Sequence, residues 1–168
     1  LTAIDRDRKR IGHIEENLER LGLFADVIST ELEAYSNENG FDRVLLDVPC
    51  SASGIVRRHP DIKLLRQKSD VDKLEAIQRT LLNKAFDLLR TGGELLYSTC
   101  SIFPRENEDI IADFINNRSD AACRPLSLDI TSSAIVKTPH GIQLLPTNDQ
   151  HDGFFYASIK KIGAETLS

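Results

Sequence analysis

The sequence RVLLDVPCS, residues 43–51, says most about the fold of this chain. Residues 43–48 are mostly Val and Leu, which is typical of a buried β-strand, and Pro49 cannot continue such a strand. Asp47 and Cys50 therefore stand where the strand ends, and a serine follows the cysteine. The pattern predicts an inner strand whose carboxyl end carries a carboxylate and a thiol.

A second stretch, ELLYSTCS at residues 94–101, repeats the pattern, with Cys100 at the end of the strand and Ser101 after it. Two thiols at the same edge of one sheet can share one covalent reaction, in which one attacks and the other helps the product to leave. A single cysteine at a strand end is more often a small core residue. The repeated pattern, together with Asp47, favours a reactive role for Cys50 and Cys100.

Around these two stretches, apolar runs alternate with helical patterns. We expect strands at residues 1–4, 24–28, 43–48, 94–99 and 154–159, with a weaker signal at 121–126. We expect helices through Ile11, Ile14, Leu18 and Leu21 up to Gly22, over residues 71–90 up to Gly92 and Gly93, and from Pro104 to residue 117, with Glu106, Glu108 and Asp109 in the first turn. A polar linker is expected at residues 131–141. The alternation predicts an α/β fold with a parallel sheet and helices on both faces.

The composition fits one globular domain, with no membrane-spanning segment and no signal peptide. The chain has 168 residues, 40% of them hydrophobic, and a net charge of −5, so no global positive field attracts nucleic acid. The lack of a membrane span and a signal peptide predicts a soluble, cytoplasmic protein. Its three cysteines are odd in number and widely spaced, which argues against a disulfide framework, and a reducing compartment would leave them as thiols. The four histidines show no metal-ligand spacing, so we expect no metal.

Acidic residues follow the first two expected strands. Asp5 comes directly after residues 1–4, where it would bind the ribose hydroxyls of a nucleotide cofactor or cap the helix that begins near Arg8. Glu31 lies just past the strand at 24–28, where a solvated loop carboxylate is an equally good interpretation. Ligands of open α/β sheets bind beyond the carboxyl ends of the strands, so these acids and the thiols point to one site.

One basic cluster follows the loop that carries Cys50. It consists of Arg57, Arg58, His59, Lys63, Arg66 and Lys68. Such a cluster can contact RNA phosphates around a flipped-out base, and a solvated helix face is the alternative. The sequence therefore offers a local RNA contact in a chain that is acidic as a whole.

Four motifs, in order, closely resemble those of the S-adenosylmethionine-dependent RNA cytosine-5 methyltransferases. They are FDRVLLDVPCSASG at residues 41–54, RRHPDIK at 57–63, STCS at 98–101 and DGFFYA at 152–157. The resemblance covers nearly the whole chain except residues 120–150. It implies a Rossmann-like class I methyltransferase sheet, mostly parallel with an antiparallel closing strand, and an enzyme that acts on ribosomal RNA of the small subunit, 16S.

The resemblance also implies a role for each residue type. Carbon 5 of cytosine is a poor nucleophile, so a thiolate must first add to carbon 6 and push electron density across the ring. By resemblance, Cys100 is that thiolate and Cys50 serves product release, while Asp47 contacts the ring nitrogen and exocyclic amine and faces the cofactor. The implied cofactor is S-adenosylmethionine, with Asp5 at its ribose and Glu31, where the family usually has aspartate, near its adenine.

The remaining cysteine chemistry has simpler interpretations. Cys123 matches no motif, and we interpret it as a structural residue. A disulfide between Cys50 and Cys100 is an alternative at one sheet edge, although the close Cys-x-x-Cys spacing of redox sites is absent.

The resemblance further implies that parts of the catalytic domain lie outside residues 1–168. The family's first strand, its glycine-rich cofactor loop and an amino-terminal RNA-binding region should all precede residue 1. We therefore expect a single truncated methyltransferase domain that is inactive by itself. The absent strand belongs between the strands that end at Asp5 and Asp47. These two strands then pair directly, or another chain fills the gap, or the gap is a site of disorder.

Two other classes of function stay open from the sequence. A methyltransferase for another acceptor, such as a protein amide or an exocyclic amine, needs no pair of thiols. A noncatalytic RNA-binding or assembly module would fit the acidic net charge and the absent cofactor loop. The sequence gives no indication of the oligomeric state.

Overall fold

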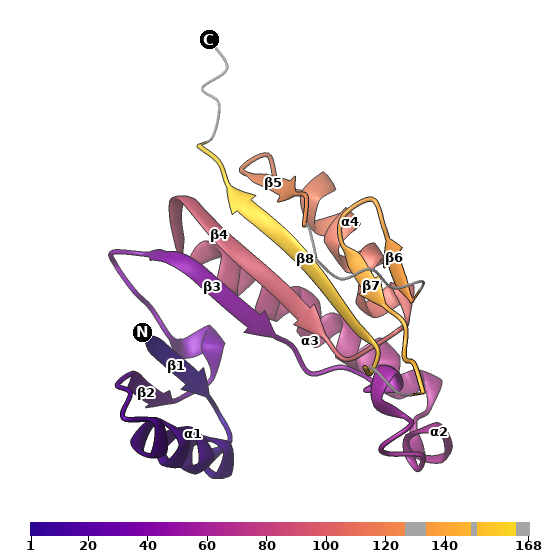
Figure 1. Cartoon of the computed structure of the whole chain (residues 1–168). Helices are drawn as coiled ribbons and strands as arrows, with labels where there is room; N and C mark the ends of the chain where they lie inside the picture. Colours follow the sequence, from indigo (N-terminus) through magenta and orange to yellow (C-terminus); the bar gives the residue numbers. More distant parts are fainter. Residues whose placement is uncertain (127–133, 149–150, 164–168) are drawn as a thin grey trace. The chain divides into compact units, whose positions relative to one another are not determined.

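The computed structural model describes residues 1–126, 134–148 and 151–163. The chain divides into two compact units, an amino-terminal unit (Leu1–Glu38) and a carboxy-terminal unit (Asn39–Ser168). Each unit has its own sheet and its own helices (Figure 1). No helix in the described ranges is long and apolar enough to cross a membrane.

The amino-terminal unit is a β-α-β element. Its elements are β1 (Thr2–Asp5), α1 (Arg8–Leu21), β2 (Asp26–Ser29) and the 3-10 helix η1 (Leu32–Ala34). Strands β1 and β2 are parallel, with Asp5 opposite Ser29, and α1 supplies the crossover that parallel strands need. Helix α1 begins at Asp7, whose side chain accepts a hydrogen bond from the Lys9 N–H at 2.8 Å, and ends at Gly22, whose φ of 63° suits glycine. The cap is therefore Asp7, and the capping interpretation of Asp5 is wrong.

The carboxy-terminal unit contains a six-stranded sheet. Its strands are β3 (Phe41–Asp47), β4 (Leu89–Thr99), β5 (Ala121–Arg124), β6 (Ile135–Lys137), β7 (Ile142–Leu144) and β8 (Phe154–Lys161). Their order is β3-β4-β8-β7-β6, and β5 also pairs with β8. Strands β3 and β4 are parallel, whereas β8 is antiparallel to β4, as expected for the closing strand. The pairings of β5, β6 and β7 are antiparallel as well.

Two long helices of this unit cover one face of its sheet (Figure 1). The helical elements are η2 (Ser53–Ile55), α2 (Ile62–Leu65), α3 (Lys68–Asp87), η3 (Pro104–Glu106) and α4 (Glu108–Asn116). Phe86 of α3 and Phe114 of α4 make an edge-to-face pair with ring centroids 5.1 Å apart. On the sheet beneath, Tyr97 of β4 and Phe155 of β8 make another at 6.4 Å. All four rings are buried, so the core lies between the two helices and the sheet.

The expected end of the long helix is wrong. Helix α3 ends at Asp87, and Gly92 and Gly93 lie inside β4 instead of stopping the helix. The two glycines belong to a bulge in the strand, in which residues 90–93 of β4 lie opposite the single residue Asp42 of β3. Gly92 has a φ of 84°, a conformation that only glycine adopts readily.

The polar linker expected at residues 131–141 is also wrong in its described part, while residues 131–133 lie outside the described residues. Strands β6 and β7 form a hairpin, closed by the Thr138 N–H donating to the Gly141 carbonyl at 3.0 Å. Strands of three residues give little periodic signal, and here they form because β7 pairs with the long strand β8.

The expected pairing of the strands that end at Asp5 and Asp47 is wrong too. Strand β1 pairs with β2 and strand β3 with β4, in two different sheets. The other two outcomes, a gap filled by another chain and a site of disorder, stay predictions.

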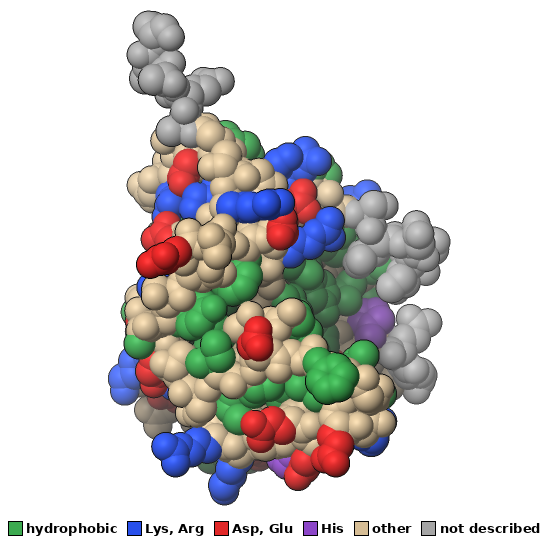
Figure 2. All heavy atoms as spheres, turned by 90° about the vertical axis from the view of Figure 1, so that its left-hand side faces the viewer, with side chains coloured by type: hydrophobic (Ala, Val, Ile, Leu, Met, Phe, Trp, Pro, Cys, Tyr) green, Lys and Arg blue, Asp and Glu red, His purple; other side chains and the backbone are tan. Residues whose placement is uncertain are grey.

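Large apolar side chains are exposed in both units, among them Phe24 at 95% and Leu45 at 71%. Figure 2 shows apolar side chains between charged ones on the surface.

Candidate active site

The carboxyl ends of β3 and β4 bring the two cysteine loops together. These strands are parallel with Asp47 opposite Ser98, so the residues that follow them leave the sheet at the same edge. The Val48 N–H extends the ladder by donating to the Ser98 carbonyl at 3.2 Å. Beyond it, the Sγ atoms of Cys50 and Cys100 lie 3.3 Å apart, within hydrogen-bonding distance for sulfur. The structure therefore places the two thiols singled out in the sequence in direct contact.

Each thiol changes the acidity of the other. The hydrogen bond with Cys50 lowers the pKa of Cys100 below its ordinary value, although burial and the negative charge of Asp47 act in the opposite direction. The same hydrogen bond, together with burial, raises the pKa of Cys50. Cys100 is therefore the sulfur that more easily carries a negative charge, and Cys50 is the sulfur that keeps its proton.

A buried carboxylate lies beneath the two loops. Glu106 accepts hydrogen bonds from the hydroxyls of Ser51 and Ser101, both at 2.5 Å, and from the Ser51 N–H at 2.8 Å. The Ser101 hydroxyl also lies 3.1 Å from that of Ser53. These serines and Glu106 are buried, so the polar groups of the network satisfy one another away from solvent.

A second set of buried side chains holds the Cys100 loop. The Asn107 amide donates to the Ser101 carbonyl at 2.9 Å and to the Gln143 side chain at 2.8 Å. The Gln143 amide also donates to the Ser101 carbonyl, at 3.2 Å, and the Thr99 hydroxyl donates to Asn107 at 2.6 Å. Gln143 comes from β7, so the unexpected hairpin contributes to the site.

Sequence reasoning missed these supporting residues. Glu106 was expected in the first turn of a helix, but it ends η3, and α4 begins only at Glu108. Its partner Ser51 is 55 positions away, a separation that no local pattern reports. The available signal was the serine that follows each cysteine, since two buried hydroxyls need an acceptor.

Two glycines let the Cys50 loop pack on the segment before β8. The Gly54 N–H donates to the Cys100 carbonyl at 2.9 Å, and the Gly54 carbonyl accepts from the Gly153 N–H at 2.8 Å. A Cβ atom at Gly54 would collide with the Gly153 carbonyl. In the same loop Ala52 has a φ of 60°, and it is the non-glycine residue with positive φ in the described part of the chain. The loop is thus held in a tight conformation beside the thiols.

Asp47 stands at the end of β3, at the same edge as the thiols. Its charge raises the pKa of Cys100, as stated above, and burial together with that charge raises the pKa of Tyr156 in β8. The carboxylate is exposed at its position on the strand. It is therefore close to Cys100 and accessible to a ligand.

The basic cluster is partly engaged by the protein itself. Arg58 and Arg57 pair with Asp152 at 2.7 Å and 3.6 Å, and the Arg66 side chain donates to the Ser51 carbonyl at 3.0 Å. These contacts join the cluster to Asp152, in the segment before β8, and to Ser51, in the Cys50 loop. Arg57, Arg58 and the neighbouring His59 and Lys63 are exposed.

A pocket of about 560 Å³ lies beside the Cys50 loop. Ser51 and Ser53 form part of its wall, which is mainly apolar, and Lys63 and Lys68 line it as well. Neither lysine side chain is bonded to another residue of the described part of the chain. The pocket thus combines apolar walls with free positive charges next to the thiol site.

The two acids expected at the cofactor belong to the amino-terminal unit. Asp5 accepts a hydrogen bond from the Asp7 N–H at 2.8 Å and pairs with Arg10 at 3.2 Å. Glu31 pairs with Arg6 at 3.6 Å, and its side chain is 56% exposed. Asp5 is the last residue of β1 and Glu31 lies just past β2, and among the residues that the structure describes each has one arginine within ion-pair distance.

The third cysteine, Cys123, has a hydrogen-bond partner of its own. The Cys123 thiol donates to the His140 carbonyl at 3.1 Å, and burial raises its pKa. No group of three or more His, Cys, Asp or Glu side chains within residues 1–126, 134–148 and 151–163 could hold a metal ion.

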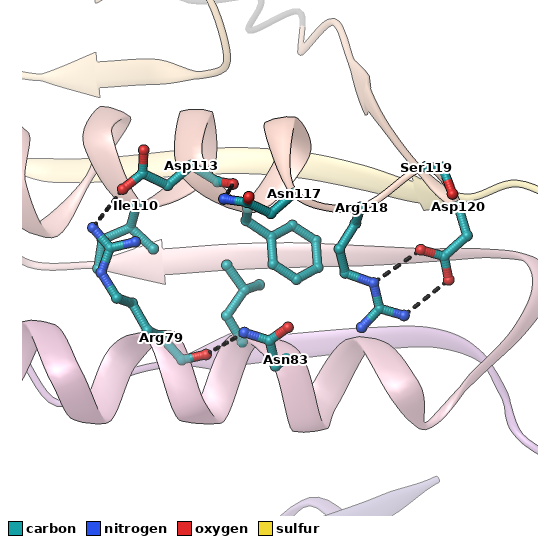
Figure 3. A pocket seen from close by; sticks show the side chains of 10 residues that line it. Arg79, Asn83, Ile110, Asp113, Asn117, Arg118, Ser119 and Asp120 are labelled. Atoms are coloured by element: carbon teal, nitrogen blue, oxygen red, sulfur yellow. Dashed lines mark hydrogen bonds and ion pairs between the residues drawn. The ribbon is translucent and has the colours of Figure 1, made fainter.

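A separate pocket of about 460 Å³ lies between α3 and α4 (Figure 3). Arg79 pairs with Asp113 and Arg118 pairs with Asp120, each at 2.8 Å, so the charges at its rim are neutralised in pairs. Its wall contains none of the predicted site residues. The thiol site is therefore the stronger candidate for chemistry.

The fold and the site define the class of protein, a Rossmann-like methyltransferase. A methyltransferase homolog protein from Pyrococcus horikoshii shares the fold with a TM-score of 0.77 and 29% identity, over 96% of this chain and 53% of that one. NSun6 from the same organism, solved with SFG, gives a TM-score of 0.80 and 28% identity over 96% and 41% of the two chains.

The sequence narrows this class to a family. Residues 1–160 match the model of the 16S rRNA methyltransferase RsmB/F family, and the chain belongs to that family. It is 44% identical to ribosomal RNA small subunit methyltransferase B of Pseudomonas syringae pv. tomato, over 98% of this chain and 38% of that protein. It is 42% identical to the Pseudomonas putida protein of the same name, over 98% and 37%. The resemblance drawn from the four motifs is thus confirmed, for a chain that spans 38% and 37% of these relatives.

Proposed function

We propose that the protein containing this chain methylates carbon 5 of a cytosine in small-subunit ribosomal RNA, through a covalent bond between Cys100 and the base. Membership of the family supports a methyltransferase that acts on RNA. The observation that carries the cytosine-5 chemistry is the 3.3 Å contact between the sulfur atoms of Cys50 and Cys100. Methylation of an amide or an exocyclic amine needs no thiol, whereas addition to a pyrimidine ring and the later elimination give each of two thiols a task.

The attack begins at Cys100. Its lowered pKa increases the thiolate fraction near neutral pH. The thiolate forms a bond to carbon 6 of the ring, and the electrons of the 5,6 double bond move into the ring and make carbon 5 nucleophilic. Asp47, close to Cys100 at the same sheet edge, would contact the ring nitrogen and the exocyclic amine where charge develops.

Release needs a base that becomes available only after the attack, and Cys50 fits this requirement. The first cause of its raised pKa is its hydrogen bond with Cys100. Once the Cys100 sulfur is bonded to carbon 6, it no longer carries a thiolate charge, so this cause is removed and the pKa of Cys50 falls. After carbon 5 has received the methyl group, the Cys50 thiolate, its own proton lost to solvent, would take the remaining proton from carbon 5. The electrons of that C–H bond would re-form the 5,6 double bond, and the bond between sulfur and carbon 6 would break and return Cys100 as a thiolate.

S-adenosylmethionine, when bound, supplies an electrophilic methyl group. Asp5 and Glu31 fit its nucleoside part, because carboxylates that follow parallel strands commonly accept hydrogen bonds from ribose hydroxyls and other donors. Asp5 is partly exposed, with 22% of its side-chain surface accessible, and Glu31 is exposed at 56%, so neither is sealed from a ligand.

The basic cluster would hold the RNA around the target base. We assign phosphate contacts to Arg57, Arg58, His59 and Lys63, which are exposed beside the Cys50 loop. The apolar pocket that Lys63 lines would accept part of the RNA next to the flipped-out cytosine.

The test uses the full-length gene product and RNA that carries 5-fluorocytosine, with S-adenosylmethionine present. Fluorine cannot leave carbon 5 as a proton does, so the covalent complex should accumulate. We expect mass mapping to place the bond at Cys100. Cys100→Ala should give no complex, whereas Cys123→Ala, which removes a cysteine outside the site, should give as much as the unaltered protein. A complex through Cys50, or full methylation by Cys100→Ala, would refute the proposal.

A further inference from the structure

The serine after each thiol is bound to the same buried carboxylate. The Oε2 atom of Glu106 accepts hydrogen bonds from the hydroxyls of Ser51 and Ser101, and its Oε1 atom accepts from the Ser51 N–H. One side chain is therefore shared by the loops that carry Cys50 and Cys100.

Glu106 has no free position with which to touch a substrate. It is fully buried, and its fourth donor is the Gln78 amide, which donates to Oε1 at 3.1 Å. An ionised carboxylate has about four acceptor positions, and four donors fill them here. A buried charge is costly unless it is hydrogen-bonded, so this arrangement depends on all four partners staying in place. Because no acceptor position is left for a substrate, the geometry is consistent with a positioning role for Glu106.

Further hydrogen bonds connect Glu106 and the Cys50 loop to rigid elements on both sides. The same Gln78 amide donates to the carbonyl of Pro49, the residue before Cys50, at 2.8 Å. The Tyr97 hydroxyl donates to the backbone carbonyl of Glu106 at 2.8 Å. Gln78 belongs to α3 and Tyr97 to β4, so the carboxylate is itself held by the helical layer and the sheet.

We propose that Glu106 is the positioning residue of this site: by binding the serine of each loop, it sets the distance between the two sulfur atoms. That distance matters because the contact with Cys50 is what favours ionisation of Cys100. The consequence for turnover rests on the proposed function, whereas the consequence for the thiols does not. A merely structural role would lower stability without a specific change at the thiols.

Phenylarsine oxide tests the distance directly in the folded chain. Its arsenic atom exchanges oxygen for two thiol sulfurs and releases one water molecule, so tight binding requires two neighbouring thiols. We expect binding through Cys50 and Cys100 in the unaltered protein. Glu106→Ala leaves buried donors unpaired and should weaken binding roughly tenfold or more. Glu106→Gln can still accept on one side and donate to both serines on the other, and should retain most of the affinity.

The matched control for Glu106→Ala is Glu108→Ala. Glu108 is a partly buried carboxylate two positions away that binds His140 and not the thiol loops. Its replacement should leave arsenical binding unchanged. An equal loss in Glu108→Ala and Glu106→Ala would show a general structural effect and would count against the positioning role.

The pH dependence of Cys100 alkylation supplies a second readout. The charges of Asp47 and Glu106 raise the pKa of Cys100, while the hydrogen bond with Cys50 lowers it and is the larger effect. Glu106→Gln removes one charge and keeps the shape, so the alkylation midpoint should move to lower pH. Glu106→Ala also releases the loops and loses the Cys50 contact, so the midpoint should move to higher pH.

The outcomes separate the two proposals. Unchanged arsenical affinity and an unchanged alkylation midpoint in a folded Glu106→Ala protein would overturn the positioning role. If that variant does not fold, two other variants decide. The positioning role is overturned if Ser101→Ala does not weaken arsenical binding several-fold and Glu106→Gln does not move the alkylation midpoint to lower pH. Neither assay uses RNA or cofactor. A protein that shows the Glu106 effects but forms no complex with 5-fluorocytosine RNA would refute the proposed function alone.

Discussion

The two units of this chain hold their functional side chains in opposite ways. In the carboxy-terminal unit, Cys50 and Cys100 are fixed by buried serines, by Glu106 and by a core that excludes water. In the amino-terminal unit, Asp5 and Glu31, the acids that we propose for the cofactor, each pair with an exposed arginine, and Asp5 also accepts a hydrogen bond from the Asp7 N–H. Exposed ion pairs contribute about 0–1 kcal/mol, whereas an unpaired buried polar group costs about 1–3 kcal/mol.

The burial of apolar residues shows the same difference. Ile11 is the buried core residue of the amino-terminal unit, while Phe24 is 95% exposed and Leu23 57% exposed. The carboxy-terminal unit buries several aromatic and aliphatic residues completely, among them Phe86 and Phe155. The geometry that we propose for catalysis thus lies where packing fixes it, and the acids that we propose for ligand binding lie where they stay accessible.

Removal of a buried thiol should give the largest effect. Cys50→Ala in the full-length gene product should slow turnover by roughly 10²–10⁴-fold, because the proton on carbon 5 loses its base. The bond between RNA and Cys100 should then persist with ordinary cytosine, visible as a slow-migrating complex in denaturing gels. Normal turnover, or the absence of a complex, would remove Cys50 from the release step.

A matched pair of phenylalanine truncations tests the comparison of the two cores. Phe86→Ala should lower the free energy of unfolding by about 3–5 kcal/mol, since it empties a fully buried position. Phe24→Ala should change it by less than about 0.5 kcal/mol, because that ring is exposed. Urea denaturation followed by circular dichroism gives both values. A large loss at Phe24 would mean that its ring is covered in solution, and the contrast between the units would fail.

Replacement of Asp5 should weaken cofactor binding without lowering the stability of the protein. Asp5→Asn in the full-length gene product should weaken S-adenosylmethionine binding by about 1–3 kcal/mol, because a charged acceptor for the ribose is lost. Its melting temperature should barely change, because Arg10, the ion-pair partner of Asp5, is 62% exposed. Calorimetry measures the affinity, and Asp26→Asn, an exposed acid of the same unit, is the control. Equal affinities for all three proteins would exclude Asp5 from the cofactor site.

The smallest effect should be the difference between the pH values at which Cys100 and Cys123 react with an alkylating reagent. The hydrogen bond with Cys50 lowers the pKa of Cys100, whereas burial and the charge of Glu108 raise the pKa of Cys123. Since the thiolate is the reactive form, iodoacetamide should modify Cys100 at lower pH than Cys123. Mass spectrometry across a pH series measures this order, and Cys50→Ala should move the Cys100 midpoint upward. The reverse order would contradict the electrostatic description of the pair.

Much of the fold could be predicted because its signals are local. The strands that end near Asp47 and Cys100 show as short apolar runs, and helix α1 shows as apolar residues at helical spacing before Gly22. The hairpin of β6 and β7 could not be predicted, since its short strands have little pattern of their own and form by pairing with β8. The bulge at Gly92 was missed for a similar reason, because a glycine pair after a helical pattern is also the usual signal for a helix end.

The sequence by itself determined the family, the alternation of strands and helices, and the presence of a cysteine after each of two strands, because these properties depend on neighbouring residues. Only the tertiary structure decided that the two sulfur atoms touch, which of them ionises more easily, and that Glu106 holds both loops. Those properties depend on groups about 50 positions apart in the chain. Their distances and electric fields exist only after the parallel strands have paired and water has been excluded.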